Sequence, residues 1–188
     1  MGQLIEVRWH GRGGQGAVTA AQILAESAFL EGYKGVQAFP YFGAERRGAP
    51  IMAFTRISDE EIRIRSQIYN PDFVVVLDST LLGLIRIDEG IREGGTIIIN
   101  SSKKPGELNI KGNFQVFTTD VTTVAQDLGL IVAGIPVLNT PILGAFSKIT
   151  GLISLETLTK VIEKKWQGEI GRRNAQAAKI TFQKTISY

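Results

Sequence analysis

The sequence predicts an α/β protein. We expect a Rossmann-like, mostly parallel sheet flanked by helices, with a β-hairpin insertion and C-terminal helices, in a single domain over residues 1–188. Residues 4–9 alternate as a strand does, a glycine-rich turn follows, and residues 17–30 are almost entirely apolar, which is the order of half a βαβ unit. Continuous apolar runs at 73–77 and 97–99 are typical of strands buried on both faces of a parallel sheet. A chain of 188 residues is long enough to bury one sizeable core.

The first helix is expected over residues 17–30, where the polar residues Thr19, Gln22 and Glu26 form one narrow stripe. A helix that is apolar on nearly every side is buried on more than one side. Two explanations stay open at this point. Either a second protein covers this helix, or the helix packs inside the core of its own chain, where alanine allows close approach. A second strand is expected at residues 35–39.

The later elements follow from alternation, capping residues and glycines. Residues 51–57 and 61–65 alternate on either side of Ser58-Asp59-Glu60, which predicts a β-hairpin. After the strand at 73–77, Asp78 is expected to cap a helix. The remaining predictions are strands at 97–99 and 114–117, and helices at 121–128 behind Asp120, at 139–151, after Ser154 and after Gly168.

The glycine-rich turn is the first candidate binding site. Its residues are Gly11, Arg12, Gly13, Gly14, Gln15 and Gly16, which match the pattern G-x-G-x-x-G. Unpaired N–H groups and the positive dipole end of the following helix would suit a phosphate or a carboxylate. An NAD site also needs an acidic residue at the end of the second strand, but that strand ends Phe39-Pro40, so an ordinary NAD site is disfavoured. The remaining alternative is a turn that only packs the helix close to the sheet.

The segment over residues 36–50 is the second candidate. It carries three aromatic residues and the adjacent pair Arg46 and Arg47. Arginine binds phosphate in a bidentate manner, and both residue types are enriched at interface anchors. Because this segment follows the second strand and the glycine turn follows the first, a parallel sheet would place both at one edge. We therefore expect Arg46 and Arg47 to bind an anion that the turn also faces, while an interface role and a solvated turn stay open.

Composition excludes several classes of function. The net charge of +3, without a run of basic residues, gives no indication of a nucleic-acid partner. The absence of cysteine excludes thiolate metal sites and Cys-ligated clusters in this chain, and the single histidine, His10, argues against a histidine metal site. We expect no metal site, no catalytic residue, no membrane span and a cytoplasmic location. His10 is expected to orient the turn rather than to catalyse, since no second titratable group adjoins it.

Four segments carry a family resemblance: HGRGGQGAVTAA, QAFPYFGAERRGAPIMAFTRI, RSQIYNPDFVVVLD and NTPILGAFSKITG. Together they resemble the γ subunit of the 2-oxoacid:ferredoxin oxidoreductases, and among these the pyruvate enzyme (pyruvate synthase). In some lineages this γ subunit is shared with the 2-oxoisovalerate enzyme. The resemblance runs from about Glu6 to Gly151 and continues weakly through the last helices.

The resemblance implies a division of labour among subunits. The α and β subunits would hold thiamine diphosphate and Mg²⁺, and a δ subunit would carry [4Fe–4S] clusters. The complex would convert a 2-oxoacid, CoA and oxidised ferredoxin into acyl-CoA, CO2 and reduced ferredoxin. This chain would be a non-catalytic subunit that supports assembly, with CoA as the candidate ligand of its turn. The alternative is a stand-alone Rossmann-like enzyme domain that binds NADP, with Arg46 or Arg47 on the 2′-phosphate. The sequence leaves open which 2-oxoacid is used.

Overall fold

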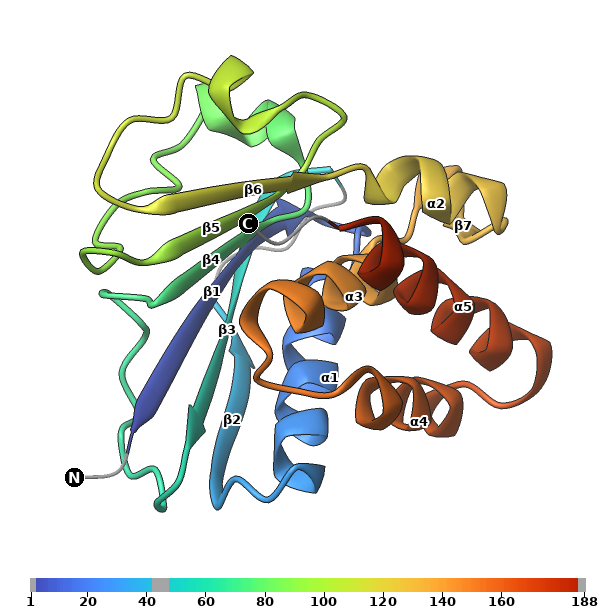
Figure 1. Cartoon of the computed structure of the whole chain (residues 1–188), viewed down its shortest axis with the longest axis horizontal. Coiled ribbons are helices and arrows are strands. Elements are labelled where there is room, and N and C mark those ends of the chain that lie inside the picture. Colours follow the sequence, from blue (N-terminus) through green and yellow to red (C-terminus); the bar gives the residue numbers. More distant parts are fainter. Residues whose placement is uncertain (1–2, 42–47, 186–188) are drawn as a thin grey trace.

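The computed structural model describes residues 3–41 and 48–185. A six-stranded mixed sheet, in the order β2-β3-β1-β4-β5-β6, forms one layer of the molecule (Figure 1). The strands are β1 (Leu4–Arg12), β2 (Gly35–Pro40), β3 (Pro50–Ser58), β4 (Phe73–Val76), β5 (Thr96–Asn100) and β6 (Gln115–Thr119). The helices are α1 (Ala17–Leu30), α2 (Val121–Asp127), α3 (Asn139–Thr150), α4 (Leu155–Lys165) and α5 (Gly168–Lys184), and two 3-10 helices are η1 (Ser79–Gly83) and η2 (Pro105–Glu107). A separate two-stranded hairpin consists of β7 (Ile131–Val132) and β8 (Ile135–Pro136).

The sheet is mostly parallel, as the sequence predicts. β1 runs parallel to β4, β4 to β5 and β5 to β6, whereas β3 runs antiparallel to both of its neighbours, β1 and β2. Because β3 reverses direction between them, β1 and β2 point the same way and end at the same edge. We call this edge, where β1, β2, β4, β5 and β6 all end, the carboxyl edge of the sheet.

The predicted hairpin between residues 51–57 and 61–65 is wrong. β3 covers the first segment, but residues 61–65 form no strand. The reason is that β3 already pairs with β1 along one side and β2 along the other, so no free side remains for a third partner. The carbonyl groups of Ile62 and Ile64 instead accept hydrogen bonds from the side chain of Gln37.

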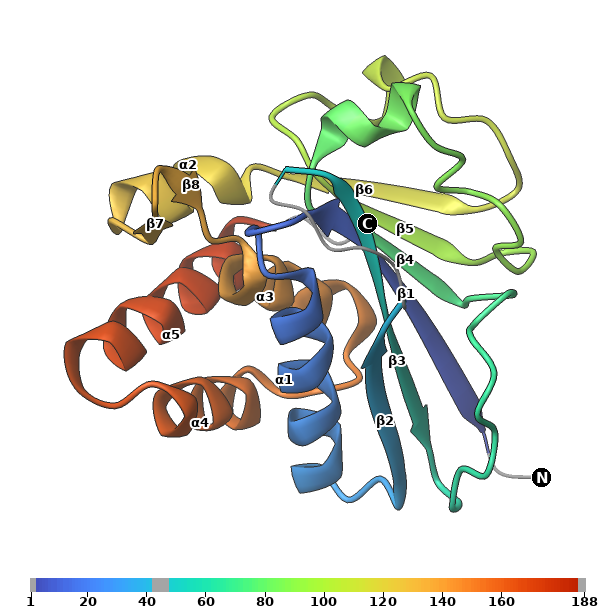
Figure 2. The same ribbon diagram turned by 180° about the vertical axis from the view of Figure 1, so that it is seen from behind.

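All five α-helices gather on one face of the sheet, as Figure 2 shows from behind. The main core lies between that face and the helices; it includes Trp9, whose ring lies 5.8 Å from that of Phe146 on α3. The opposite face carries a second, smaller apolar cluster beneath loops and 3-10 helices, with Val74, Ile97 and Ile99 at its centre. Among the described residues, no helix combines the length and the apolar character needed to cross a bilayer.

Helix α1 is covered by its own chain. It lies between the sheet on one side and α3 and α4 on the other, and eight of its residues are buried. Of the two explanations for its apolar character, ordinary core packing is therefore sufficient. Only Phe29 and Leu30, at its last turn, leave large apolar side chains exposed.

Close approach of α3 and α5 depends on Gly144. A Cβ atom added there would overlap the carbonyl oxygen of Ala178 on α5 and lie 2.8 Å from its carbonyl carbon. Since the obstacle is backbone, a small side-chain rotation cannot relieve it, and one of the two helices must move.

We predict that Gly144→Ala destabilises the chain, although alanine is the better helix former by about 1 kcal/mol. Overpacking typically costs about 1–3 kcal/mol, and here the contact is with rigid backbone, so the clash should outweigh the helix propensity. Urea unfolding of the isolated chain measures the difference. Gly83→Ala is the matched control, because a Cβ there meets no atom within 4 Å; equal stability of the two variants would contradict the packing argument.

Candidate functional site

The glycine turn is shorter than its sequence pattern suggests. β1 extends through Gly11 and Arg12, so the chain turns only at residues 13–16 before α1 begins at Ala17. Gly14 has a φ of 99° and Gly16 a φ of 94°, a left-handed conformation that strongly favours glycine. Gly16 has a second constraint, because a Cβ there would lie 2.9 Å from the Cβ of Asn139 at the start of α3. The turn therefore allows α1 to pack closely against α3.

Some backbone N–H groups of the turn already donate hydrogen bonds to acceptors within this chain. The N–H of Arg12 donates to Oε1 of Gln15 (2.8 Å), and that of Gly13 donates to the carbonyl of Ala49 (2.9 Å). The first bond inside α1 runs from the N–H of Ala20 to the carbonyl of Gly16 (2.9 Å), and no side chain caps this helix. The N–H groups of its first three residues thus have no partner on the helix itself, and these donors suit an anion.

Arg12 is held by an acidic partner from the next parallel strand. Its Nε lies 3.1 Å from Oδ2 of Asp78, two residues after the end of β4, and its Nη2 donates to Oγ1 of Thr80 (2.8 Å). Gln15 donates from Nε2 to the same carboxylate oxygen (2.9 Å). Burial would raise the pKa of Asp78, but hydrogen bonds from Thr80 and Gln15 and the charge of Arg12 lower it below its ordinary value. Asp78 therefore stays ionised at neutral pH, and Arg12 brings little uncompensated charge to the turn.

The segment with the arginine pair leaves and returns at this edge. Arg46 and Arg47 themselves lie outside the described residues. Before them, the N–H of Tyr41 donates to the carbonyl of Met52 (2.9 Å). After them, the N–H of Gly48 donates to the carbonyl of Gly13 (3.1 Å), so the segment is joined directly to the glycine turn. The prediction that both loops emerge at one edge of the sheet is confirmed for their described ends.

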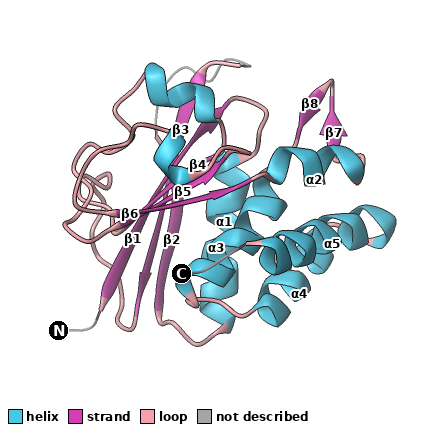
Figure 3. Ribbon diagram, turned by 45° about the horizontal axis from the view of Figure 1, so that its top comes forward, coloured by secondary structure: helices cyan, strands magenta, loops and turns pink. Residues whose placement is uncertain are grey.

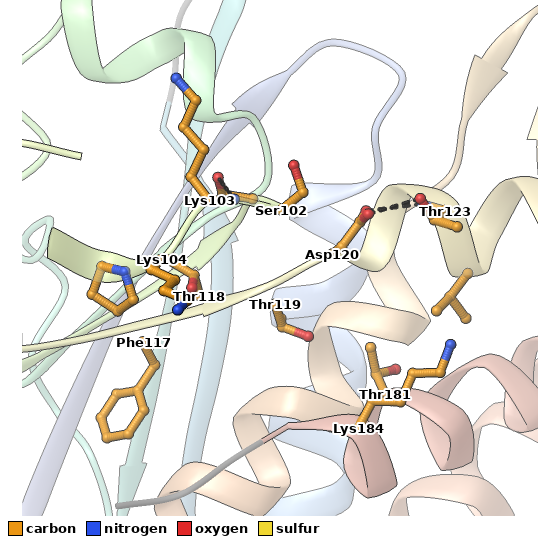
Figure 4. A pocket seen from close by; sticks show the side chains of 13 residues that line it. Ser102, Lys103, Lys104, Phe117, Thr118, Thr119, Asp120, Thr123, Thr181 and Lys184 are labelled. Atoms are coloured by element: carbon orange, nitrogen blue, oxygen red, sulfur yellow. Dashed lines mark hydrogen bonds between the residues drawn. The ribbon is translucent and has the colours of Figure 1, made fainter. Parts of the chain in front are cut away.

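Two open hollows continue from the turn along the carboxyl edge. One, of about 680 Å³, is lined by Gln15 and Asp78 of the turn network, by residues after β5, and by Pro136 and Leu138. The other, of about 580 Å³, lies between the end of β6 and the end of α5 (Figure 4). Its basic residues are Lys103, Lys104 and Lys184, and Figure 4 shows that Lys103 and Lys184 stand at opposite ends of the hollow. Sequence reasoning missed these lysines, although Ser101-Ser102-Lys103-Lys104 directly follows a buried strand.

The described residues contain no cluster of three or more His, Cys, Asp or Glu side chains that could bind a metal ion.

His10 lies on the loop-covered face of the sheet, where its side chain is 2% exposed and its Nε2 accepts a hydrogen bond from Nε of Arg8 (3.1 Å). Burial, followed by the charge of Arg8, lowers the pKa of His10 to about 3. The imidazole is therefore neutral at physiological pH and does not exchange protons there.

This burial predicts a specific pH dependence of stability. Because the folded pKa of His10 (about 3) lies below the ordinary 6.5, the unfolded chain binds more protons as pH falls through this window, and stability is lost. His10→Gln keeps an acceptor for Arg8 but does not titrate. Between pH 7 and pH 5 we expect the wild-type chain to lose about 2 kcal/mol more of its unfolding free energy than the variant does. If urea titrations show that the wild type and the variant lose the same unfolding free energy over this pH range, His10 is accessible to protons in the folded state.

Comparisons with known proteins agree with this architecture. The family model described as "Pyruvate ferredoxin/flavodoxin oxidoreductase" matches residues 6–184. A relative from Thermococcus litoralis, the "Pyruvate/ketoisovalerate oxidoreductases common subunit gamma", is 52% identical over 188 residues, covering 98% of this chain and 99% of the relative. The "Pyruvate synthase subunit PorC" of Methanocaldococcus jannaschii is 48% identical over 183 residues, with 97% and 98% covered.

A solved structure is similar over the whole fold. The crystal structure of pyruvate oxidoreductase subunit PORC from Thermotoga maritima superposes with a TM-score of 0.83 at 39% identity, covering 98% of each chain. Sequence relatives and structural neighbour therefore agree. This chain belongs to the pyruvate ferredoxin/flavodoxin oxidoreductase family, as a gamma subunit of the 2-oxoacid:ferredoxin oxidoreductases.

Proposed function

We propose that this gamma subunit is non-catalytic, supports assembly of the oxidoreductase and holds the phosphate end of CoA at the carboxyl edge of its sheet. The catalysed reaction is then 2-oxoacid, CoA and oxidised ferredoxin to acyl-CoA, CO2 and reduced ferredoxin, with pyruvate as the expected 2-oxoacid and the cytoplasm as the location. The companions are the α, β and δ subunits of the same enzyme, and ferredoxin accepts the electrons.

The redox and thiamine chemistry is assigned to those companions. This chain has no cysteine to bind a [4Fe–4S] cluster, and its described part has no acidic cluster for Mg²⁺. Thiamine diphosphate supplies the reactive carbon that attacks a 2-oxoacid, and the clusters carry electrons to ferredoxin. This chain would contribute binding and orientation of CoA, because fixed N–H donors and arginine side chains recognise phosphate.

The observation that carries the proposal is the uncapped start of α1 after a turn that bonds to Gly48, the residue that follows Arg46 and Arg47 in the sequence. The helix offers N–H donors and about half a positive charge, which do not neutralise a phosphate. Arg12 adds little, since Asp78 already compensates it. Arg47 precedes Gly48 in the sequence, and the N–H of Gly48 bonds to the carbonyl of Gly13 in the turn, which supports the arginine pair as the source of the missing charge. We therefore assign Gly11, Arg12, Gly13, Gly14, Gln15 and Gly16 to shaping the site, and Arg46 and Arg47 to binding the phosphates.

A stand-alone NADP-binding enzyme domain, the alternative left open by the sequence, is not supported by the family. A comparison of CoA and NADP binding tests this alternative directly. Isothermal titration of the assembled complex with CoA and with NADP should give binding of CoA alone, and NADP binding that depends on Arg46 or Arg47 would favour the alternative.

We predict that Arg46→Ala or Arg47→Ala raises the Michaelis constant for CoA by roughly 10- to 150-fold, because charge-assisted hydrogen bonds contribute about 1.5–3 kcal/mol each. The Michaelis constant for the 2-oxoacid should stay nearly unchanged. Arg63→Ala is the matched control, since its side chain is exposed and pairs only locally with Glu61.

Gel filtration of each mutant complex separates this role from an interface role. Loss of subunits with unchanged CoA dependence in the remaining complex would make the arginines interface anchors. An intact complex with unchanged CoA dependence would leave the pair as a solvated turn and reject the proposal.

A further inference from the structure

We infer that the hollow beside Arg8, on the loop-covered face of the sheet, binds an organic monocarboxylate with an apolar tail. This site goes beyond the proposed function, because it is separate from the edge at which CoA is proposed to bind. No described residue lines both this hollow and either of the two hollows at the carboxyl edge. Figure 3 shows the loops on this side of the sheet, away from the α-helices.

Arg8 is a buried cation whose bonds all go to neutral acceptors. The residue is only 7% exposed. Its Nε donates to Nε2 of His10 (3.1 Å), and its Nη2 donates to the carbonyl oxygens of Ile87 (2.9 Å) and Glu89 (2.6 Å). The imidazole is neutral at physiological pH, as its low pKa shows. These bonds fix the guanidinium group but do not compensate its charge.

Arg56, buried on the same face, shows the usual arrangement, because its Nε lies 2.8 Å from Oε1 of Glu6. Arg8 forms no such ion pair with a described carboxylate. Its Nη1, which carries two N–H donors, has no hydrogen-bond partner among the described residues. Burial lowers the pKa of Arg8, whereas the charges of Glu89 and Asp88 raise it. Since buried charges are normally paired, an anion at Nη1 would complete this site.

The hollow has the size and the lining of a small-molecule site. Its volume is about 480 Å³, within the usual range for ligand pockets. Arg8 lines it together with Met52 and Phe54 of β3, and Phe54 is the residue opposite Arg8 in the neighbouring strand. Tyr41 and Tyr69 add aromatic side chains that are 46% and 62% exposed. One cation beside aromatic and aliphatic surface suits an acid with an apolar tail.

The two loops that line the hollow are joined to each other. Nδ2 of Asn70 donates to the carbonyl of Gly90 (3.1 Å). Gly90 has a φ of 71°, and a Cβ there would overlap the carbonyl oxygen of Tyr69. Arg8 also holds the second loop through the carbonyl of Glu89. Because these contacts exist without a ligand, binding would cost little ordering of the walls.

The charges around the hollow favour a single negative charge on the ligand. Arg86 and Glu89 also line it, and Nε of Arg86 lies 3.8 Å from Oδ1 of Asp88. The two acids offset the two arginines, so the region is close to neutral before a ligand binds. A monocarboxylate would gain the open donors of Arg8, whereas a dianionic phosphate would meet stronger repulsion from the two acids.

The test is a nuclear magnetic resonance titration of the full chain with phenylacetate at constant ionic strength. Phenylacetamide is the matched neutral ligand, because it has the same ring without the charge. We expect phenylacetate to bind roughly 10- to 150-fold more tightly, since a charge-assisted hydrogen bond distinguishes the two. The amide signals of Asn70 and Gly90 should shift, and those of residues 13–20 should not. Inorganic phosphate should give no binding that depends on Arg8.

Arg8→Met should reduce the affinity for phenylacetate to that for phenylacetamide. Arg63→Met is the matched control, because this exposed arginine pairs only with Glu61, and it should leave the affinity unchanged. Tyr69→Ala is a second variant at an exposed position, which keeps the test decisive if Arg8→Met does not fold. It should weaken phenylacetate roughly 2- to 10-fold, through loss of an aromatic contact, and leave acetate binding unchanged.

Equal affinities for phenylacetate and phenylacetamide would overturn the inference, and so would phenylacetate binding that persists in Arg8→Met. Shifts confined to residues 13–20 would place the ligand at the glycine turn instead. Binding that appears only in Glu45→Gln, at a position outside the described residues, would show that the chain supplies its own carboxylate to Arg8. Loss of binding in the assembled complex would show that a companion subunit supplies the anion. Each of these results would reject the site without touching the proposed role of Arg46 and Arg47, which CoA kinetics test separately.

Discussion

The close approach of Gly16 to Asn139 is the contact on which the candidate site depends. It joins the start of α1 to the start of α3, with the Cβ position of Gly16 only 2.9 Å from that of Asn139. The β7–β8 hairpin precedes α3 and the turn precedes α1, so this approach joins the two segments, together with the hydrogen bond from the N–H of Leu138 to the carbonyl of Gln15. Any side chain at position 16 would combine a steric overlap with an unfavourable left-handed backbone. The glycine turn is therefore first a packing device, and its donors are a consequence of how closely the two helices meet.

The carboxyl edge then collects groups from distant parts of the sequence. The turn ends β1, Asp78 follows β4, and the hairpin follows α2, yet all three touch the same small region. Asp78 compensates Arg12 and receives Gln15, so the turn is rigid and nearly neutral before any ligand arrives. A preformed site of this kind would lose little conformational entropy on binding, and we propose that Arg46 and Arg47 supply the charge needed to select an anion.

Local patterns predicted most elements, because the physics that forms them is local. α1 begins after a left-handed glycine, and the strands β4 and β5 contain continuous apolar runs at residues 73–76 and 97–99. Residues 61–65 alternate equally well, but strand pairing is decided by which edges are free, and β3 has none. The β7–β8 hairpin escaped prediction because its strands are two residues long and its turn lacks the Asn-Gly signal. The bond between Gln15 and Asp78 joins residues 63 positions apart, which no spacing rule reveals.

Our central proposal is that a phosphate of CoA binds at the start of α1 in the assembled enzyme. The most direct measurement is the structure of the purified complex with CoA bound, determined by cryo-electron microscopy. We predict a CoA phosphate within hydrogen-bonding distance of the N–H groups at the first turn of α1, with a guanidinium group of Arg46 or Arg47 against it. CoA held entirely by other subunits, with the start of α1 facing only protein or water, would contradict it.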